Sequence, residues 1–228
     1  MPASLETRFT KFLECIVGAE SIDALHTPSP NDPEMADYYL SDRKIVAEIK
    51  SLNADQMVKG SVVLDEHLSD KGYVIFGTLP SSRITDSSEE EAILKRKIQV
   101  KMTTRIKKIC SKANKQIASQ SEKLPHLATG LLILINENNT SLHPSMVAER
   151  VVDFAMSQPR SFHYCLLVFE SHKISVNGSI LSVFSFFNFS INSNIEFKSP
   201  ANFLAFSSSK EILASLDMCF TVLRSIAM

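Results

Sequence analysis

The chain has 228 residues, with 24 lysines and arginines against 25 aspartates and glutamates and a formal net charge of −1. Its 44% hydrophobic and 21% charged content excludes disordered, collagen-like and coiled-coil classes. Near-neutral charge argues against a nucleic-acid partner unless the positive charge is gathered in one place. No apolar run is long enough to span a bilayer, and four widely spaced cysteines are typical of a reduced protein, so we expect a cytoplasmic location and no membrane contact.

Hydrophobic spacing predicts the elements of the first part of the chain. Residues 4–17 carry apolar side chains three and four positions apart, which indicates an amphipathic helix. Two β-rich stretches, 36–40 and 45–52, flank a short turn and predict a hairpin, and residues 73–79 predict a strand.

The second part alternates helices and strands. Ser87 can cap a long helix that runs to about Ser121, with acidic residues in its first turn. Strands are predicted at 129–136, 162–170, 173–176 and 180–189, and helices at 145–156 and 209–227. We therefore expect one α/β domain over 1–228 with a mixed β-sheet flanked by helices, its core at about 4–170 and a C-terminal hairpin and helix over 173–228.

Three charged side chains come together in the predicted hairpin. If the turn occupies Ser41–Lys44, or only its two central residues, Asp37 faces Glu48 across the strands. Lys50 lies two residues further along and so shares that face. Opposed carboxylates are destabilising without compensation, and a divalent cation would compensate. Two carboxylates and a lysine therefore suit metal-assisted hydrolysis of a phosphodiester.

These residues resemble a known family. Asp37 followed by Glu48-Ile49-Lys50, within the stretch Val46–Ser51, looks like the motif of the PD-(D/E)XK nuclease superfamily. The resemblance implies a restriction-endonuclease-like core. It also implies that Asp37 and Glu48 bind Mg²⁺ or Mn²⁺, that the backbone carbonyl of Ile49 joins them, and that Lys50 is the catalytic lysine.

Two further positions follow from the resemblance. The family often adds an acid from its first helix, for which Glu14 is the first candidate and Glu6 the second. Members often carry a glutamine on the helix after the motif, which Gln116 would match. The chain departs from the pattern at Ala36, where the motif has proline, and in the stretch of about 38 residues between Lys50 and the long helix.

Positive charge is concentrated in that long helix. Residues 92–120 contain nine basic residues and no acids: Lys95, Arg96, Lys97, Lys101, Arg105, Lys107, Lys108, Lys112 and Lys115. The rest of the chain carries 15 basic residues against 25 acidic ones. One polar row borders the predicted buried face and consists of Lys97, Lys101, Arg105, Lys108, Lys112 and Gln116. The row suits binding along the phosphates of a nucleic acid, and the alternative is that it is a solvated surface.

The resulting hypothesis is a Mg²⁺-dependent endonuclease acting on DNA, with a role in restriction or phage defence by family analogy. The alternative is a nucleic-acid-binding or assembly module with the same fold and no catalysis. A small-molecule enzyme or protein-interaction subunit is a third class and has no motif in its favour. The phenylalanines of 184–189 suit core packing or a homodimer face, and less well the stacking of bases.

Overall fold

The structure is a computed structural model that describes residues 3–26, 34–52, 57–72, 84–176, 179–188 and 204–206. Its helices are α1 (Leu5–Glu14), α2 (Ile22–Leu25), α3 (Met57–Asp70), α4 (Ser88–Ser121) and α5 (Pro144–Ser157). Its strands are β1 (Glu20–Ser21), β2 (Tyr38–Leu40), β3 (Ile45–Ser51), β4 (Thr129–Asn136), β5 (Phe162–Val176), β6 (Ser179–Asn188) and β7 (Leu204–Phe206). None of the described helices is long and apolar enough to cross a membrane.

The strands form one mixed sheet of seven strands in sequence order. The central strands β3, β4 and β5 run parallel, and antiparallel strands complete both sides. Residues Gly130–Asn136 of β4 are all buried, as expected of a parallel strand with both faces covered. The sheet is thus compatible with the predicted α/β class.

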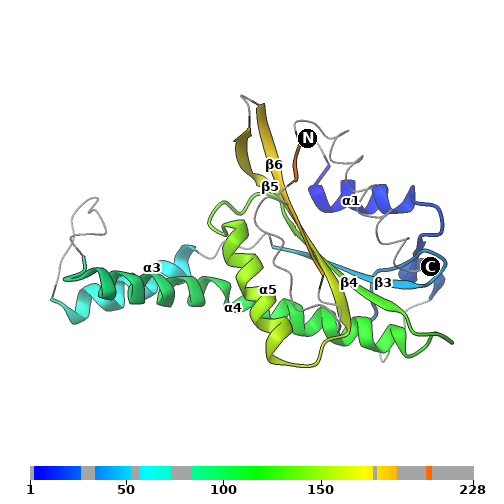
Figure 1. Ribbon diagram of the computed structural model, residues 1–228, viewed down its shortest axis with the longest axis horizontal. Helices are drawn as coiled ribbons and strands as arrows, with labels where there is room; N and C mark the ends of the chain where they lie inside the picture. Colours follow the sequence, from blue (N-terminus) through cyan, green and yellow to red (C-terminus); the bar gives the residue numbers. More distant parts are fainter. Residues whose placement is uncertain are drawn as a thin grey trace.

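Helices cover the two faces of the sheet (Figure 1). On one face, α1 packs its buried residues Leu5, Phe9 and Leu13 against the odd-numbered side chains of β3. On the other face, α4 and α5 cover the even-numbered side, where Ile106, Ala113 and Ile117 of α4 belong to one cluster with Val46 of β3. The charged residues at even-numbered positions of β3 therefore lie on the side of α4.

Close packing between α4 and the sheet depends on Gly130. A Cβ atom there would lie 2.1 Å from the carbonyl oxygen of Ser161 and 2.7 Å from Cγ2 of Ile117. No real Cβ tolerates such contacts with backbone, so only glycine allows β4 to approach its neighbours this closely.

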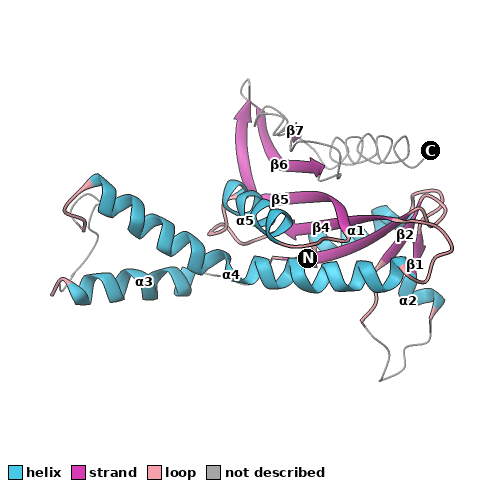
Figure 2. Cartoon of the chain, turned by 60° about the horizontal axis from the view of Figure 1, so that its bottom comes forward, coloured by secondary structure: helices cyan, strands magenta, loops and turns pink. Residues whose placement is uncertain are grey.

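The first part of α4 projects beyond the sheet and pairs with α3, as Figures 1 and 2 show. We call this pair of helices the arm. It has a small core of its own, formed by Leu68, Ile84 and Leu94. Gly60 faces Met102 and Ile98, so the missing side chain lets α3 approach α4.

The predicted hairpin, the long helix, the strand at 129–136 and the helix at 145–156 are confirmed, the last two within one residue at each end. The first helix is also confirmed but ends at Glu14. No element was predicted over α3, whose glycine and β-branched Val58, Val62 and Val63 weaken the helical pattern. The predicted strand at 73–79, the helix at 209–227 and the phenylalanine side chains of 184–189 lie outside the described residues.

Candidate metal centre

The register of the hairpin brings the two predicted carboxylates together. Tyr38 pairs with Ala47, and the N–H of Asp37 donates to the carbonyl oxygen of Ala47 at 3.1 Å. One residue further, Asp37 lies opposite Glu48. The turn is the four-residue form, Ser41–Lys44, so the predicted register is confirmed.

Three residues of that turn have positive φ angles. Ser41, Asp42 and Arg43 have φ values of 52°, 54° and 65°, a left-handed conformation that costs about 1–2 kcal/mol for each non-glycine residue. An ion pair at 2.7 Å between Arg43 and Glu20 of β1 offsets part of this cost and ties the turn to the edge of the sheet.

Glu48 is the most unusual residue of the site. Its side chain is 0% exposed, and neither carboxylate oxygen receives a hydrogen bond of ordinary geometry in the part of the chain that the structure describes. The Lys50 ammonium lies against Oε1 as an ion pair. Burial, reinforced by the nearby charge of Asp37, raises the pKa of Glu48 to about 8 despite the opposing effect of Lys50. The charge of Lys50 therefore does not offset the cost of burying this carboxylate.

Asp37 is half-buried and is held by the neighbouring strand. Its Oδ2 accepts a hydrogen bond from the N–H of Ile49 at 2.6 Å. Burial raises its pKa, although this hydrogen bond and the charge of Lys50 act in the opposite direction. Ile49 thus contacts the site through its amide, while the role predicted for its carbonyl stays a prediction.

The acids of the first part of the chain are arranged differently from the expectation. The carboxylates of Glu6 and Asp23 are those that act on Asp37 and raise its pKa further. Glu14, the first candidate of the sequence analysis, acts instead on the hydroxyl of Tyr38. Of the two predicted helix residues, Glu6 is thus the one whose charge reaches Asp37. Asp23 was missed because α2 carries no motif that distinguishes it.

Helix α4 borders the site through Lys112. The charge of Lys112 lowers the pKa of Glu48, and its ammonium forms an ion pair at 2.7 Å with Glu34, three residues before Asp37. Gln116 does not lie on the exposed basic row as expected. It is 7% exposed, and its Nε2 donates to the carbonyl oxygen of Met35 at 2.7 Å. Gln116 therefore holds the segment that leads into Asp37.

The residues present fit a small, hard divalent cation. Mg²⁺ prefers oxygen ligands and is often held by one or two carboxylates, with water and substrate phosphate completing its shell. Asp37 and Glu48 supply two carboxyl groups, and a cation that displaces the Glu48 proton would satisfy the two buried oxygens of that side chain. Within the described ranges, no group of three or more aspartates, glutamates, histidines or cysteines is placed to hold a metal ion, so a cation here would depend on these two carboxyl groups.

Comparison with known proteins adds no relative. No protein family, no curated protein and no solved structure matches the chain. The functional argument therefore depends on the residues and their geometry.

Proposed function

We propose that this chain is a Mg²⁺-dependent nuclease that hydrolyses phosphodiester bonds of DNA through Asp37, Glu48 and Lys50. The observation that carries the proposal is Glu48, a wholly buried carboxylate that lies opposite Asp37 and whose only ion-pair partner among the described residues is Lys50. Such an arrangement is costly to folding unless a cation or a proton occupies it. The mixed sheet with helices on both faces supports the restriction-endonuclease-like core.

The residues have distinct roles in this proposal. Asp37 and Glu48 hold the cation, and the Ile49 N–H fixes the orientation of the Asp37 carboxylate. When bound, Mg²⁺ would supply Lewis-acid polarisation of the phosphoryl group. Lys50 has a side chain 21% exposed, so its ammonium can reach both Glu48 and a substrate. Its N–H groups orient an attacking water and stabilise negative charge that develops on the phosphate.

The proposed test compares two lysines of the same hairpin. Purified protein is incubated with supercoiled plasmid in Mg²⁺ or in EDTA, and nicked and linear products are measured on gels. We expect Lys50→Ala to lower the cleavage rate by about 10²–10³-fold, as removal of a charge-stabilising donor does elsewhere. Lys44→Ala changes an exposed lysine in the turn and should leave the rate unchanged. Equal rates for the wild type and Lys50→Ala would contradict the proposal.

A second candidate is a nucleic-acid-binding or assembly module without catalysis. The observation that favours it is the basic, acid-free part of α4 over residues 92–120, which could bind phosphates without a metal. It predicts retention on DNA with steep salt dependence and no Mg²⁺-dependent cleavage in the plasmid assay. A homodimer with two such centres stays a prediction.

A further inference from the structure

Five basic residues form one straight row along α4. Lys97, Lys101, Arg105, Lys108 and Lys112 recur at intervals of three or four positions, so they lie on one side of the helix. All five side chains are exposed. We call this row the basic strip.

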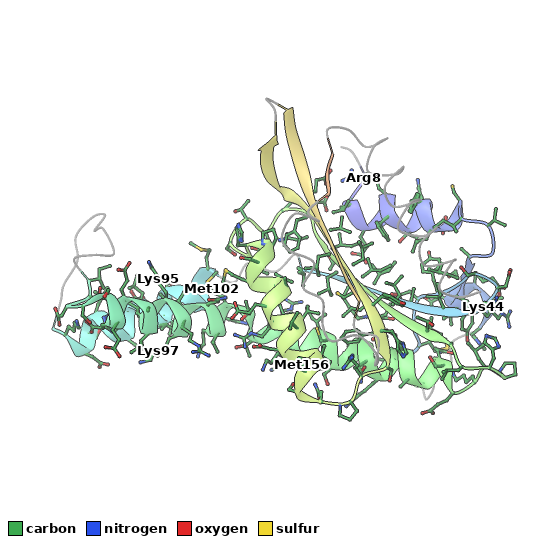
Figure 3. The ribbon with its side chains drawn as sticks, in the orientation of Figure 1. Arg8, Lys44, Lys95, Lys97, Met102 and Met156 are labelled. Atoms are coloured by element: carbon green, nitrogen blue, oxygen red, sulfur yellow. The ribbon has the colours of Figure 1, made fainter. Side chains whose placement is uncertain are left out.

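The basic strip begins at the candidate metal centre and leads onto the arm. Lys112, at one end, forms an ion pair at 2.7 Å with Glu34, three residues before Asp37 of the centre. Lys97, at the other end, lines a hollow between α3 and α4 together with Glu66, Asp70 and Glu90, and Figure 3 shows it on the projecting part of α4. The strip therefore joins the centre to the end of the molecule that extends beyond the sheet.

The basic strip is open to a partner. α5 contacts a different side of α4, through hydrogen bonds from Gln99 to Glu149 at 2.6 Å and from Arg150 to Thr103 at 3.0 Å. Lys112 pairs with the exposed Glu34. The other four strip residues form no ion pair with any residue in the described ranges, so their charge is available to an anionic partner.

The composition of the arm favours a duplex over a single strand. Proteins that hold single strands combine positive charge with aromatic side chains on which bases stack. Helices α3 and α4 contain no phenylalanine, tyrosine or tryptophan. A straight row of cations on a rigid helix suits the phosphates of a stiff duplex, which are contacted without reading the bases.

We infer that the substrate is duplex DNA lying along α4 on one side of the scissile bond, with the basic strip gripping its phosphates. The inference rests on the proposed nuclease function. It is tested below by cleavage, which requires that function, and by DNA binding, which does not. From Lys97 to Lys112 the helix rises about 22 Å, at about 1.5 Å per residue. At about 3.4 Å per base pair, that length corresponds to about 6–7 base pairs.

The cleavage test maps how near to a duplex end the protein cuts. A pool of end-labelled duplexes of mixed sequence is digested in Mg²⁺ and the cut positions are read at single-nucleotide resolution. We call the shortest distance from a cut to the end of the cleaved strand the margin. Because the strip lies on one side of the centre, the margin should be about 6–7 base pairs (about 22 Å of duplex) at either the 5′ or the 3′ end of that strand, and shorter at the opposite end. Equal margins at 5′ and 3′ ends would overturn the inference.

A matched pair of double variants tests which lysines set that margin. Removing the outer strip residues in Lys97→Ala/Lys101→Ala leaves a strip from Arg105 to Lys112, so the margin should shrink to about 3 base pairs. Arg96→Ala/Lys107→Ala removes the same charge from exposed positions off the strip and should leave the margin unchanged. The same margin in both variants would overturn the inference.

Binding separates failure of this inference from failure of the nuclease proposal. Fluorescence anisotropy with Lys50→Ala protein measures affinity for a 20-base-pair duplex and for a 20-nucleotide single strand, without cleavage. The four unpaired strip cations predict a log–log salt slope of about −3.6 for the duplex, and about 150-fold weaker binding at 200 mM than at 50 mM salt. Adding Lys97→Ala/Lys101→Ala should reduce the slope by about 1.8, whereas the off-strip pair should not change it. Tighter binding to the single strand, or equal slopes in the two variants, would overturn the inference even if the protein cleaves plasmid.

Discussion

Replacing Glu48 by glutamine should stabilise the metal-free protein at neutral and higher pH. The unfolded chain releases the Glu48 proton near the ordinary pKa of 4.5, whereas the folded chain holds it until a pKa of about 8. Between these values the folded state binds more protons than the unfolded state, so the free energy of unfolding falls as pH rises. Below about pH 4.5 both states are protonated and this loss is absent.

The magnitude follows from the two pKa values. Each pH unit inside the window costs about 1.4 kcal/mol, so the wild type should lose about 3–4 kcal/mol between pH 5 and pH 8 from this group. Glu48→Gln keeps the shape of the side chain and removes the titration. The variant should therefore gain that amount relative to the wild type, or roughly 10 °C in melting temperature for a chain of this size.

The assay is urea unfolding followed by circular dichroism, in EDTA, at several pH values from 5 to 8.5. Comparing the variant with the wild type cancels the other titrating groups. Mg²⁺ at about 100 times its dissociation constant should restore about 2.7 kcal/mol to the wild type at pH 8 and leave the variant unchanged. Parallel stability curves for the two proteins across pH 5–8 would refute the account of Glu48 as a buried carboxylate whose burial outweighs its pairing with Lys50.

Three further changes test the rest of the structure. Asp37→Asn keeps an acceptor for the Ile49 N–H but removes a negative charge. We therefore expect calorimetry to show at least tenfold weaker Mg²⁺ binding, with little change in the free energy of unfolding. Unchanged affinity would exclude Asp37 as a ligand. Gly130→Ala should destabilise the fold by about 3 kcal/mol or more in urea unfolding, because the new Cβ meets backbone, and a loss below about 0.5 kcal/mol would contradict the close approach. Ser87→Ala removes the side chain that accepts from the Glu90 N–H and should cost about 1 kcal/mol, while Ser88→Ala, one residue later, should cost less.

Much of the centre could be predicted from the hairpin sequence. The strand period of two residues and a turn between Leu40 and Ile45 leave one register in which the apolar side chains stay buried. That register sets Asp37 opposite Glu48, with Lys50 on the same face. Local pattern was therefore enough to bring three residues of the centre together.

The helical spacing of α4 had a different limit. It separates a buried stripe from an exposed basic row, but it cannot say where along the helix the neighbouring elements begin and end. Gln116 continues the spacing of the row, yet the segment at Met35 covers it and takes its amide hydrogen bond. Lys97 and Lys101 stay exposed because α5 meets α4 on another side of the helix, at Gln99 and Thr103.

The sequence by itself determined the near-zero net charge, the separation of that charge into a basic helix and an acidic remainder, and the hairpin that carries the carboxylates. Tertiary structure decided the rest. It placed α4 over the even-numbered face of β3, which removes Glu48 from water and raises its pKa. It also brought Glu6 and Asp23, rather than Glu14, within electrostatic reach of Asp37. Burial and through-space charge depend on which segments meet, and no local periodicity encodes those meetings.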